Sequence, residues 1–223
     1  MSNEKQYDSF ASDFSDSVGK TLISRNIFYE ILDEDLNNKN LLDVACGDGT
    51  DLTYYQGKGA QISGVDASEE LVEIANSKFS KDVVKVGRME DLPYEDNSFD
   101  LVVSKYALQT SKDLKECLME LARVAKSGAT ILYLTVHPIR QFLEKKEKYR
   151  DYYEQEEVRS VLFKGEIVAT ELSHTFSEYF DEDVLKKMKL TSITEESDFS
   201  DTSAQQVGGD YYPTFMVCKF VKI

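Results

Sequence analysis

Two glycines and three acidic residues follow a short apolar run in the stretch LLDVACGDGTD, residues 41–51. Gly47 and Gly49 allow a tight turn that lets a ligand approach the backbone beside the start of a helix. A dinucleotide-binding turn would have a third glycine where this chain has Leu52, and Asp48 would repel a pyrophosphate. The lysine of a phosphate-cradling loop is also missing from this stretch. The turn therefore favours a ligand that lacks phosphate and carries positive charge.

A further acid, Asp66, ends the next apolar run, GVDAS. An acid at this place can accept hydrogen bonds from both hydroxyls of a ribose. The alternative is that Asp66 caps the helix that begins near Ser68. A ligand with a ribose and a positive charge but no phosphate suggests S-adenosylmethionine, whose sulfonium and ammonium groups favour acidic surroundings.

Elements that would position these acids can be read from the hydrophobic pattern. Ser68 with two following glutamates predicts a helix start, and apolar residues at helical spacing predict a helix over 112–126 that Gly128 ends. Strands joined by helices form a parallel sheet with right-handed crossovers, so we predict an α/β three-layer fold with ligands bound past the carboxyl ends of the strands. The predicted strands are 40–45, 60–66, 82–86, 99–104, 129–136, 190–197 and 215–221.

We expect a single domain of residues 1–223, with 39–136 as its cofactor-binding core. The segments before and after this core do not alternate between strands and helices in the same way. Residues 1–38 have helical spacing and predict one or two helices, an N-terminal helical cap. Residues 137–175 are charged and tyrosine-rich, with a possible hairpin around Gly165; they form either a solvated helical face or a lid insertion. Residues 176–223 would supply a closing helix and strands.

Overall composition narrows the function further. The chain has 26 basic and 41 acidic residues, a formal charge of −15, which disfavours nucleic acid as a partner. Its three cysteines, Cys46, Cys117 and Cys218, are widely spaced, which predicts reduced thiols and no metal site. Apolar runs fall short of the roughly 20 residues of a membrane span. The first residues lack a signal peptide pattern, so we expect a cytoplasmic protein.

Four motifs, in this order and spacing, resemble those of class I S-adenosylmethionine-dependent methyltransferases: LLDVACGDGTDL, GVDASEELVEIA, MEDLPYEDNSFDLVVSKYALQ and CLMELARVAKSGATIL. The small-molecule branch that includes quinone-biosynthesis methyltransferases is the most similar, and even YDSFASDF resembles the segment that often begins those proteins. The resemblance covers roughly residues 7–136. It implies a Rossmann-like three-layer sandwich whose mostly parallel seven-stranded sheet has an antiparallel last strand.

This resemblance also implies which residues hold S-adenosylmethionine. Those at the methionine part would be Asp43, Ala45, Gly47, Gly49 and Ser104. Those at the ribose and the adenine would be Asp66, Ala67, Met89 and Glu90.

Departures from the family pattern occur at three places. Ala45 replaces a common glycine, which is a mild change. Arg88 stands where an aspartate often contacts the adenine amino group, which puts that contact in doubt. Ser127 and Ala129 replace a proline and a glycine before the fifth strand, a change that we expect to affect only the turn.

Methyl transfer requires mainly alignment and exclusion of water, and a base only where the acceptor must lose a proton. His137 and His174 are candidate bases because the ordinary histidine pKa lies near neutral pH. Alternatively, His137 ends a strand and His174 flanks a helix. Tyr7 and Tyr106 are candidates for the acceptor pocket, although core or surface packing is the commoner role of a tyrosine.

A metal-independent methyltransferase acting on O, N or C of a small molecule is the leading hypothesis. SKYA stands where an amino-methylating DNA or protein-glutamine enzyme would have a sequence like NPPY, and no catechol-type metal cluster is evident. The alternatives are an RNA or protein methyltransferase, a non-catalytic S-adenosylmethionine-binding module, and a nicotinamide oxidoreductase that Leu52 and Asp48 disfavour. The protein would be a monomer or a homodimer.

Overall fold

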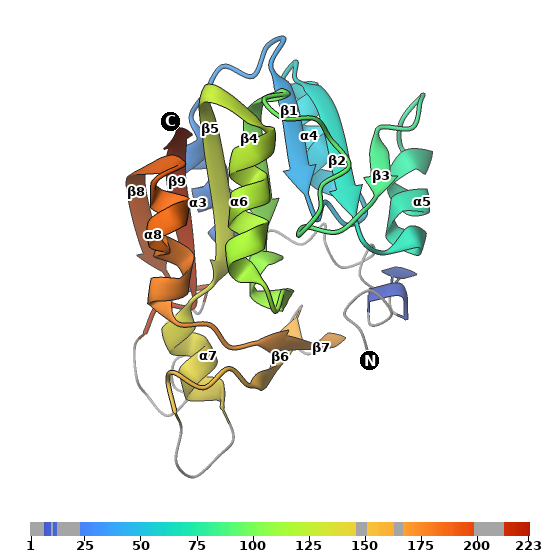
Figure 1. The fold of residues 1–223 in the computed structure, drawn as a ribbon. Helices are drawn as coiled ribbons and strands as arrows, with labels where there is room; N and C mark the ends of the chain where they lie inside the picture. Colours follow the sequence, from blue (N-terminus) through green and yellow to red (C-terminus); the bar gives the residue numbers. More distant parts are fainter. Residues whose placement is uncertain (1–6, 10, 13–22, 146–150, 163–166, 199–211) are drawn as a thin grey trace.

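A seven-stranded sheet is the centre of the molecule in a computed structural model, which describes residues 7–9, 11–12, 23–145, 151–162, 167–198 and 212–223 (Figure 1). The strands lie in the order β3-β2-β1-β4-β5-β9-β8, and β9 is antiparallel to both of its neighbours. The predicted Rossmann-like sandwich with an antiparallel last strand is confirmed. The strands are β1 (Asn40–Val44), β2 (Gln61–Asp66), β3 (Val84–Val86), β4 (Phe99–Lys105), β5 (Ala125–Val136), β8 (Met188–Glu196) and β9 (Phe215–Lys222).

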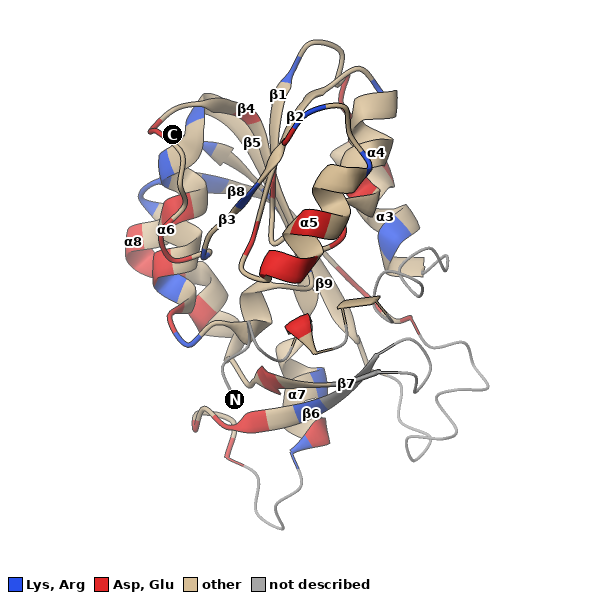
Figure 2. Ribbon diagram, turned by 90° about the vertical axis from the view of Figure 1, so that its right-hand side faces the viewer, with Lys and Arg blue, Asp and Glu red and all other residues tan. Residues whose placement is uncertain are grey.

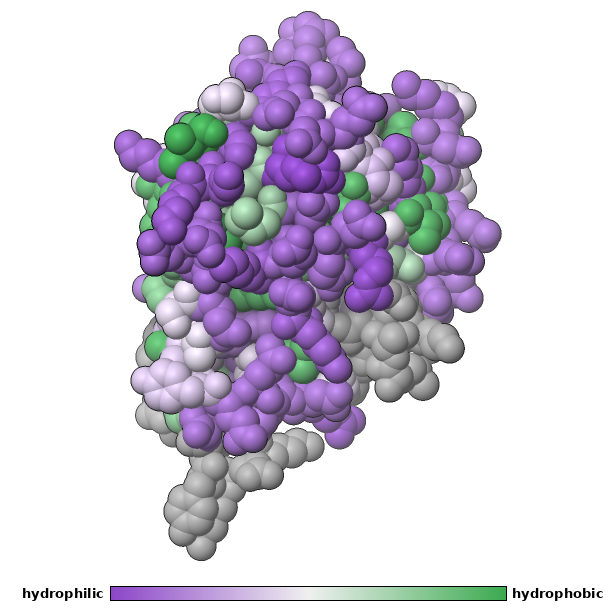
Figure 3. All heavy atoms as spheres, in the orientation of Figure 1, coloured by the Kyte–Doolittle hydropathy of each residue, from purple (hydrophilic) through white to green (hydrophobic). Residues whose placement is uncertain are grey.

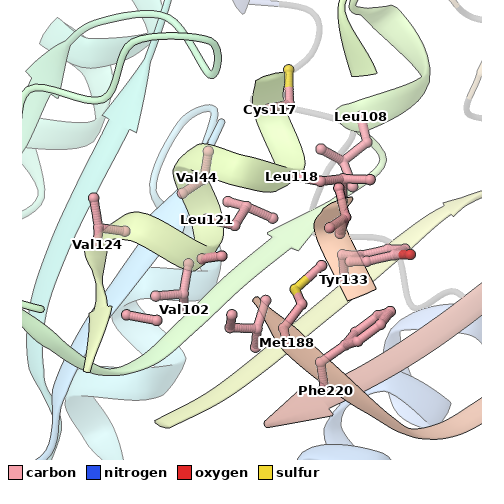
Figure 4. Packing of buried hydrophobic residues seen from close by; sticks show 14 of the residues in the cluster. Val44, Val102, Leu108, Cys117, Leu118, Leu121, Val124, Tyr133, Met188 and Phe220 are labelled. Atoms are coloured by element: carbon pink, nitrogen blue, oxygen red, sulfur yellow. The ribbon is translucent and has the colours of Figure 1, made fainter. Parts of the chain in front are cut away.

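Helices cover both faces of the sheet and bury two hydrophobic clusters against it. One face carries α6 (Leu114–Val124), the 3-10 helix η3 (Phe176–Phe180) and α8 (Glu182–Leu185). The other carries α3 (Ile23–Leu32), α4 (Thr50–Gly57) and α5 (Glu69–Ser77). Figure 4 shows the first cluster, in which side chains of α6 pack over β4, β5, β8 and β9. Because successive strand residues point to opposite faces, β1 contributes to both clusters.

Signals at the helix ends explain where α5 and α6 lie. The Leu71 amide donates to Ser68 Oγ at 3.2 Å, so the predicted cap of α5 is confirmed. The end of α6 differs from the prediction, because its last carbonyls, of Arg123 and Val124, accept hydrogen bonds from Asn97 and Ser98. The chain becomes extended at Ala125, and β5 starts four residues before the predicted 129.

A second, two-stranded sheet lies on the side to which the parallel strands point (Figure 1). It pairs β6 (Glu157–Leu162) with β7 (Ile167–Leu172), as the predicted hairpin requires, although Gly165 itself lies outside the described residues. The helix α7 (Pro138–Glu144) connects β5 to this sheet. Gln141 of α7 is fully buried and donates to the Leu172 carbonyl at 2.8 Å, which fixes α7 against the hairpin.

Acidic residues are spread over several helices, including α5 and α8 (Figure 2), and hydrophilic residues dominate the face shown in Figure 3. Throughout the described ranges, every helix is too short or too polar to cross a bilayer.

Candidate active site

Three residues of the turn after β1 have left-handed backbone conformations: Ala45 (φ 57°), Gly47 (φ 55°) and Gly49 (φ 74°). Gly49 is the N-cap of α4, and a Cβ atom there would lie 3.1 Å from the Cβ of Ala75 on α5. Glycine therefore permits both the turn and the close packing of α4 on α5. Ala45 adopts the same kind of conformation in spite of its side chain.

Asp66 ends β2 and holds the glycine turn. Its Oδ2 accepts from the Gly47 amide at 2.8 Å, and its Oδ1 accepts from the Ser68 amide at 3.0 Å. Burial raises the pKa of Asp66, while these amides oppose the rise. The Ala67 amide also forms a hydrogen bond to Asp66, so about one of the roughly four acceptor positions of an ionised carboxylate remains. The capping role that we considered as an alternative belongs to Ser68, the N-cap of α5, and Asp66 holds the turn before it.

The sequence argument from Asp48 was wrong. Its carboxylate accepts from the Thr50 hydroxyl at 2.8 Å and from the Lys78 ammonium of α5 at 2.5 Å. Asp48 is buried, with 2% of its surface exposed, and its charge is balanced by Lys78. It therefore stabilises the turn and does not select a cation.

Asp43, which the family resemblance placed at the methionine part, has a different environment from Asp48. It lies on β1 with 2% of its surface exposed, and among the described residues no hydrogen bond reaches its carboxylate. Burial raises the pKa of Asp43 well above its ordinary value, and the charge of Asp51 adds to the rise. A cationic ligand group beside Asp43 would supply the missing partner and favour ionisation.

Glu90 lies in the loop after β3, beside the loop after β4. The Ser111 hydroxyl donates to Glu90 Oε1 at 2.5 Å, and Arg88 Nε lies 3.4 Å from Glu90 Oε2. Arg88, which departs from the family pattern, therefore pairs with its own loop.

Other expected cofactor residues line the same edge with varied exposure. Ala67 and Met89 are half-buried, and Met89 packs against the hydrophobic cluster around α6. Ser104 is buried at the end of β4, where its hydroxyl donates to the Val44 carbonyl at 2.9 Å. This bond ties β4 to β1, so a role for Ser104 toward a ligand would involve its backbone.

Residues 42–133, which contain this whole edge, match the family model of a methyltransferase domain. Ajmaline N-methyltransferase from Rauvolfia serpentina is 37% identical over 131 residues, 52% of this chain and 44% of that protein. Demethylmenaquinone methyltransferase from Lactococcus lactis is 34% identical over 113 residues, 47% of this chain and 45% of that protein. Over residues 42–133 the chain is therefore similar to class I S-adenosylmethionine-dependent methyltransferases.

The structural comparison agrees with this family. An S-adenosylmethionine-dependent methyltransferase from Mesorhizobium loti has a TM-score of 0.69 over 89% of this chain and 97% of its own, at 16% identity. That likeness shows a common fold. The matched segments span a little less than half of the curated relatives, 44% and 45% of their lengths.

Both ring nitrogens of His137 form hydrogen bonds within the protein. The Ile139 amide donates to Nδ1 at 3.1 Å, so the proton lies on Nε2, which donates to Glu195 Oε1 at 2.7 Å. The ring is 1% exposed and serves as the N-cap of α7. These contacts favour the structural alternative for His137, a residue that ends β5 and starts α7.

His174 follows the β6–β7 hairpin and is also buried, with 2% of its surface exposed. Its Nε2 donates to the Ser111 carbonyl at 2.9 Å, while its amide donates to Gln141 Oε1 at 3.1 Å. Burial lowers the pKa of His174, and Glu178 opposes the change. The ring is therefore neutral and joins the hairpin to the loop after β4.

Both expected tyrosines are half-buried. Burial raises the pKa of Tyr7, and the charges of Glu171 and Asp66 add to the rise. The Ser68 hydroxyl donates to Asp8 Oδ1 at 2.5 Å, so the residue next to Tyr7 lies beside the turn after β2. The Tyr106 hydroxyl donates to Asp198 Oδ2 at 2.8 Å, and its backbone is left-handed, with φ 51°. Asp198 also accepts from the Ser24 amide, so Tyr106 connects β4 to the start of α3.

The sequence analysis missed two charged residues of the α7 and hairpin region, Glu171 and Arg140. Glu171 of β7 is 2% exposed, and its charge acts on Arg140 of α7 as well as on Tyr7. Arg140 Nε pairs with Glu144 at 2.9 Å. The spacing of Arg140 and Glu144 by four residues was the one available signal, since it is typical of paired charges on a helix. Nothing in the sequence indicated that the charge of Glu171 would act on Tyr7.

Proposed function

We propose that this chain transfers the methyl group of S-adenosylmethionine to O, N or C of a small-molecule acceptor. The observation that carries the proposal is the arrangement of Asp43 and Asp66, two carboxylates at the ends of neighbouring strands, around a left-handed glycine turn. Asp66 keeps an acceptor position for a ribose hydroxyl. Asp43 is buried without a hydrogen bond from the described residues and would bind the methionine ammonium.

Further residues of the same edge would complete the cofactor site. The backbone of Ala45, Gly47 and Gly49 would approach the methionine part, with the backbone of Ser104 opposite. Ala67, Met89 and Glu90 would surround the adenine. A nicotinamide dinucleotide fits less well, because its pyrophosphate would lie at a turn beside the buried Asp43 carboxylate.

Bound S-adenosylmethionine supplies a methyl carbon that its sulfonium already activates for in-line displacement. The task of the chain is then to align the acceptor and exclude water, and the proposal requires no metal. Residues 137–175, with α7 and the β6–β7 hairpin, would be the lid that does this. Tyr7, whose neighbour Asp8 accepts a hydrogen bond from Ser68, would line the acceptor site. Tyr106 and the two histidines would support this region through the contacts described above.

Relatives acting on small molecules support this acceptor class. The names of the ajmaline and demethylmenaquinone enzymes specify small organic acceptors. The net charge of −15 disfavours an RNA substrate, since it opposes contact with phosphates. A monomer or a homodimer would suffice for the reaction.

The test is incubation of the protein with methyl-labelled S-adenosylmethionine and fractionated cell extract, followed by mass spectrometry. We expect label in the small-molecule fraction, and we expect Asp43→Asn to abolish it. Label confined to protein or RNA would contradict the proposed acceptor class. Cofactor binding without label in any fraction would favour a non-catalytic binding module.

A further inference from the structure

Lys105 ends β4 beside the point where the strand order reverses, between β1 and β4. In the parallel pairing of these strands, Asp43 lies opposite Val103. Side chains two residues apart on a strand share a face, so Lys105 lies on the same face as Val103 and its partner Asp43. That face is the one covered by α3 and α4. A lysine and an aspartate therefore share one face of the sheet at its carboxyl edge.

The surroundings of Lys105 leave part of its ammonium group available. Its side chain is 12% exposed, and Nζ forms an ion pair with Asp51 of α4. Nζ also lies 4.9 Å from the ring centre of Tyr29 and 5.3 Å from that of Phe28, both on α3. An ammonium has three donors, and among the described residues Asp51 is the single carboxylate within ion-pair distance of Nζ.

Asp51 does not depend on Lys105 alone. Arg25 donates to Asp51 from Nε at 3.0 Å, and the Tyr29 hydroxyl donates to the same carboxylate. Burial opposes ionisation of Asp51, yet the charges of Lys105 and Arg25 lower its pKa. Lys105 can therefore direct its other N–H groups to a second anion, while Arg25 and Tyr29 continue to donate to Asp51.

An α-amino acid carries an ammonium and a carboxylate on one carbon, and the pair Asp43 and Lys105 matches both groups. We propose that Lys105 binds the carboxylate of the methionine part of S-adenosylmethionine while Asp43 binds its ammonium. This inference rests on the proposed function and adds a residue that sets ligand specificity. The enzyme would require a ligand with an intact amino acid and would discriminate against nucleosides that lack the carboxylate.

The competing interpretation is that Lys105 only balances the buried charge of Asp51. The two interpretations differ in their response to the ligand. A structural lysine affects all nucleoside ligands alike, whereas a carboxylate-binding lysine affects only those that carry the carboxylate.

The experiment measures calorimetric affinities of wild type, Lys105→Met and Lys105→Arg for S-adenosylmethionine and for its decarboxylated form. We expect wild type to prefer the carboxylated ligand by about tenfold or more, and Lys105→Met to lose most of this preference, as for the loss of a charged hydrogen bond. Lys105→Arg should restore part of it. Lys115→Met is the matched control, because Lys115 pairs with Asp181 and Asp183 on the surface of α6 and α8.

Equal affinity of wild type for the two ligands would overturn the proposal, and this result requires no variant to fold. Equal weakening of both ligands by Lys105→Met would also overturn it, in favour of the structural interpretation. If wild type bound neither ligand, the proposed function itself would fail. Binding of both without preference would remove only the role of Lys105.

Discussion

At the residue scale, Ala45 has a left-handed backbone (φ 57°) in the turn that would face the cofactor. This conformation costs an L-residue about 1–2 kcal/mol, and glycine avoids that cost. Ala45→Gly should raise the free energy of unfolding by up to about 1 kcal/mol, after allowance for the greater entropy of glycine in the unfolded chain. Urea denaturation measures the change.

The matched control for Ala45 is Ala129→Gly, the same substitution in β5, where the backbone is not left-handed. This control should lose about 0.5–1 kcal/mol. If both variants lost stability equally, the strain assigned to Ala45 would be absent.

Asp66 is predicted to bind the ribose while it also holds the glycine turn. Asp66→Asn should weaken S-adenosylmethionine binding by about 1.5–3 kcal/mol, because a charged acceptor is lost. Calorimetry measures the affinity, and a melting curve reports the accompanying change in stability. Asp100→Asn is the control, since Asp100 also accepts from a backbone amide, that of Asn40, at the opposite end of the strands. Equal affinities in the two variants would show that the ribose does not bind at Asp66.

His174 predicts a dependence of stability on pH. Burial lowers its pKa below the ordinary 6.5, so the unfolded chain takes up a proton at a higher pH than the folded chain does. This contribution is therefore complete above pH 6.5 and is lost as the pH falls from 6.5 toward the folded pKa. The contacting Glu178 titrates in a separate range, because its pKa lies below 4.5.

Denaturation of wild type and His174→Gln at a series of pH values tests this contribution. Wild type should lose more stability than the variant as the pH falls below 6.5. Parallel profiles would show that His174 titrates alike in the folded and unfolded chains.

At the element scale, Gln141 joins α7 to the β6–β7 hairpin through two buried hydrogen bonds, to the Leu172 carbonyl and from the His174 amide. Gln141→Leu would leave both backbone groups unpaired at a cost of about 2 kcal/mol or more. We expect faster proteolysis between residues 151 and 172 and lower methyl transfer, with cofactor affinity retained. Gln56→Leu on the exposed surface of α4 is the control. An unaltered digestion pattern would show that Gln141 does not stabilise the hairpin.

Elements that the sequence predicted well are those with local signals. The apolar runs of β1, β2 and β4 and the cap at Ser68 depend on neighbouring residues, and the structure contains them. The predicted end of α6 was misplaced. The amides of Asn97 and Ser98 donate to the last carbonyls of this helix, and both residues lie in a loop that comes well before it in the sequence. The α7 helix was missed, since His137 and Pro138 indicated the end of a strand more strongly than the start of a helix.

The site residues show the same difference between local signals, which the sequence contains, and distant partners, which it does not reveal. The glycine turn and Asp66 were found from spacing, whereas the direction of a side chain depends on its partners. Lys78, at the end of α5, balances the charge of Asp48, which leaves Asp43 as the acid that we propose for a cationic ligand. The surroundings of His137 and His174, at Glu195 and Ser111, likewise come from distant segments.

At the scale of the whole molecule, the edge that we propose for the cofactor and the side that we propose for the acceptor come from different parts of the sequence. Residues 42–133 supply the cofactor edge and match the methyltransferase family. The proposed acceptor side consists of the N-terminal Tyr7, the hairpin residue Glu171 and α7. These parts lie outside the segment that matches the family. This division accounts for a cofactor that can be proposed from the sequence and an acceptor that must be found by experiment.

The central claim is that the edge formed by Asp43, the glycine turn and Asp66 binds S-adenosylmethionine. Isothermal titration calorimetry with S-adenosylmethionine, its demethylated product S-adenosylhomocysteine and reduced nicotinamide dinucleotide tests the claim most directly. We predict that the first two ligands bind with dissociation constants below about 1 mM, a free energy of about −4 kcal/mol or better, and that the dinucleotide does not. Failure of both S-adenosyl compounds to bind, or tighter binding of the dinucleotide, would contradict the claim.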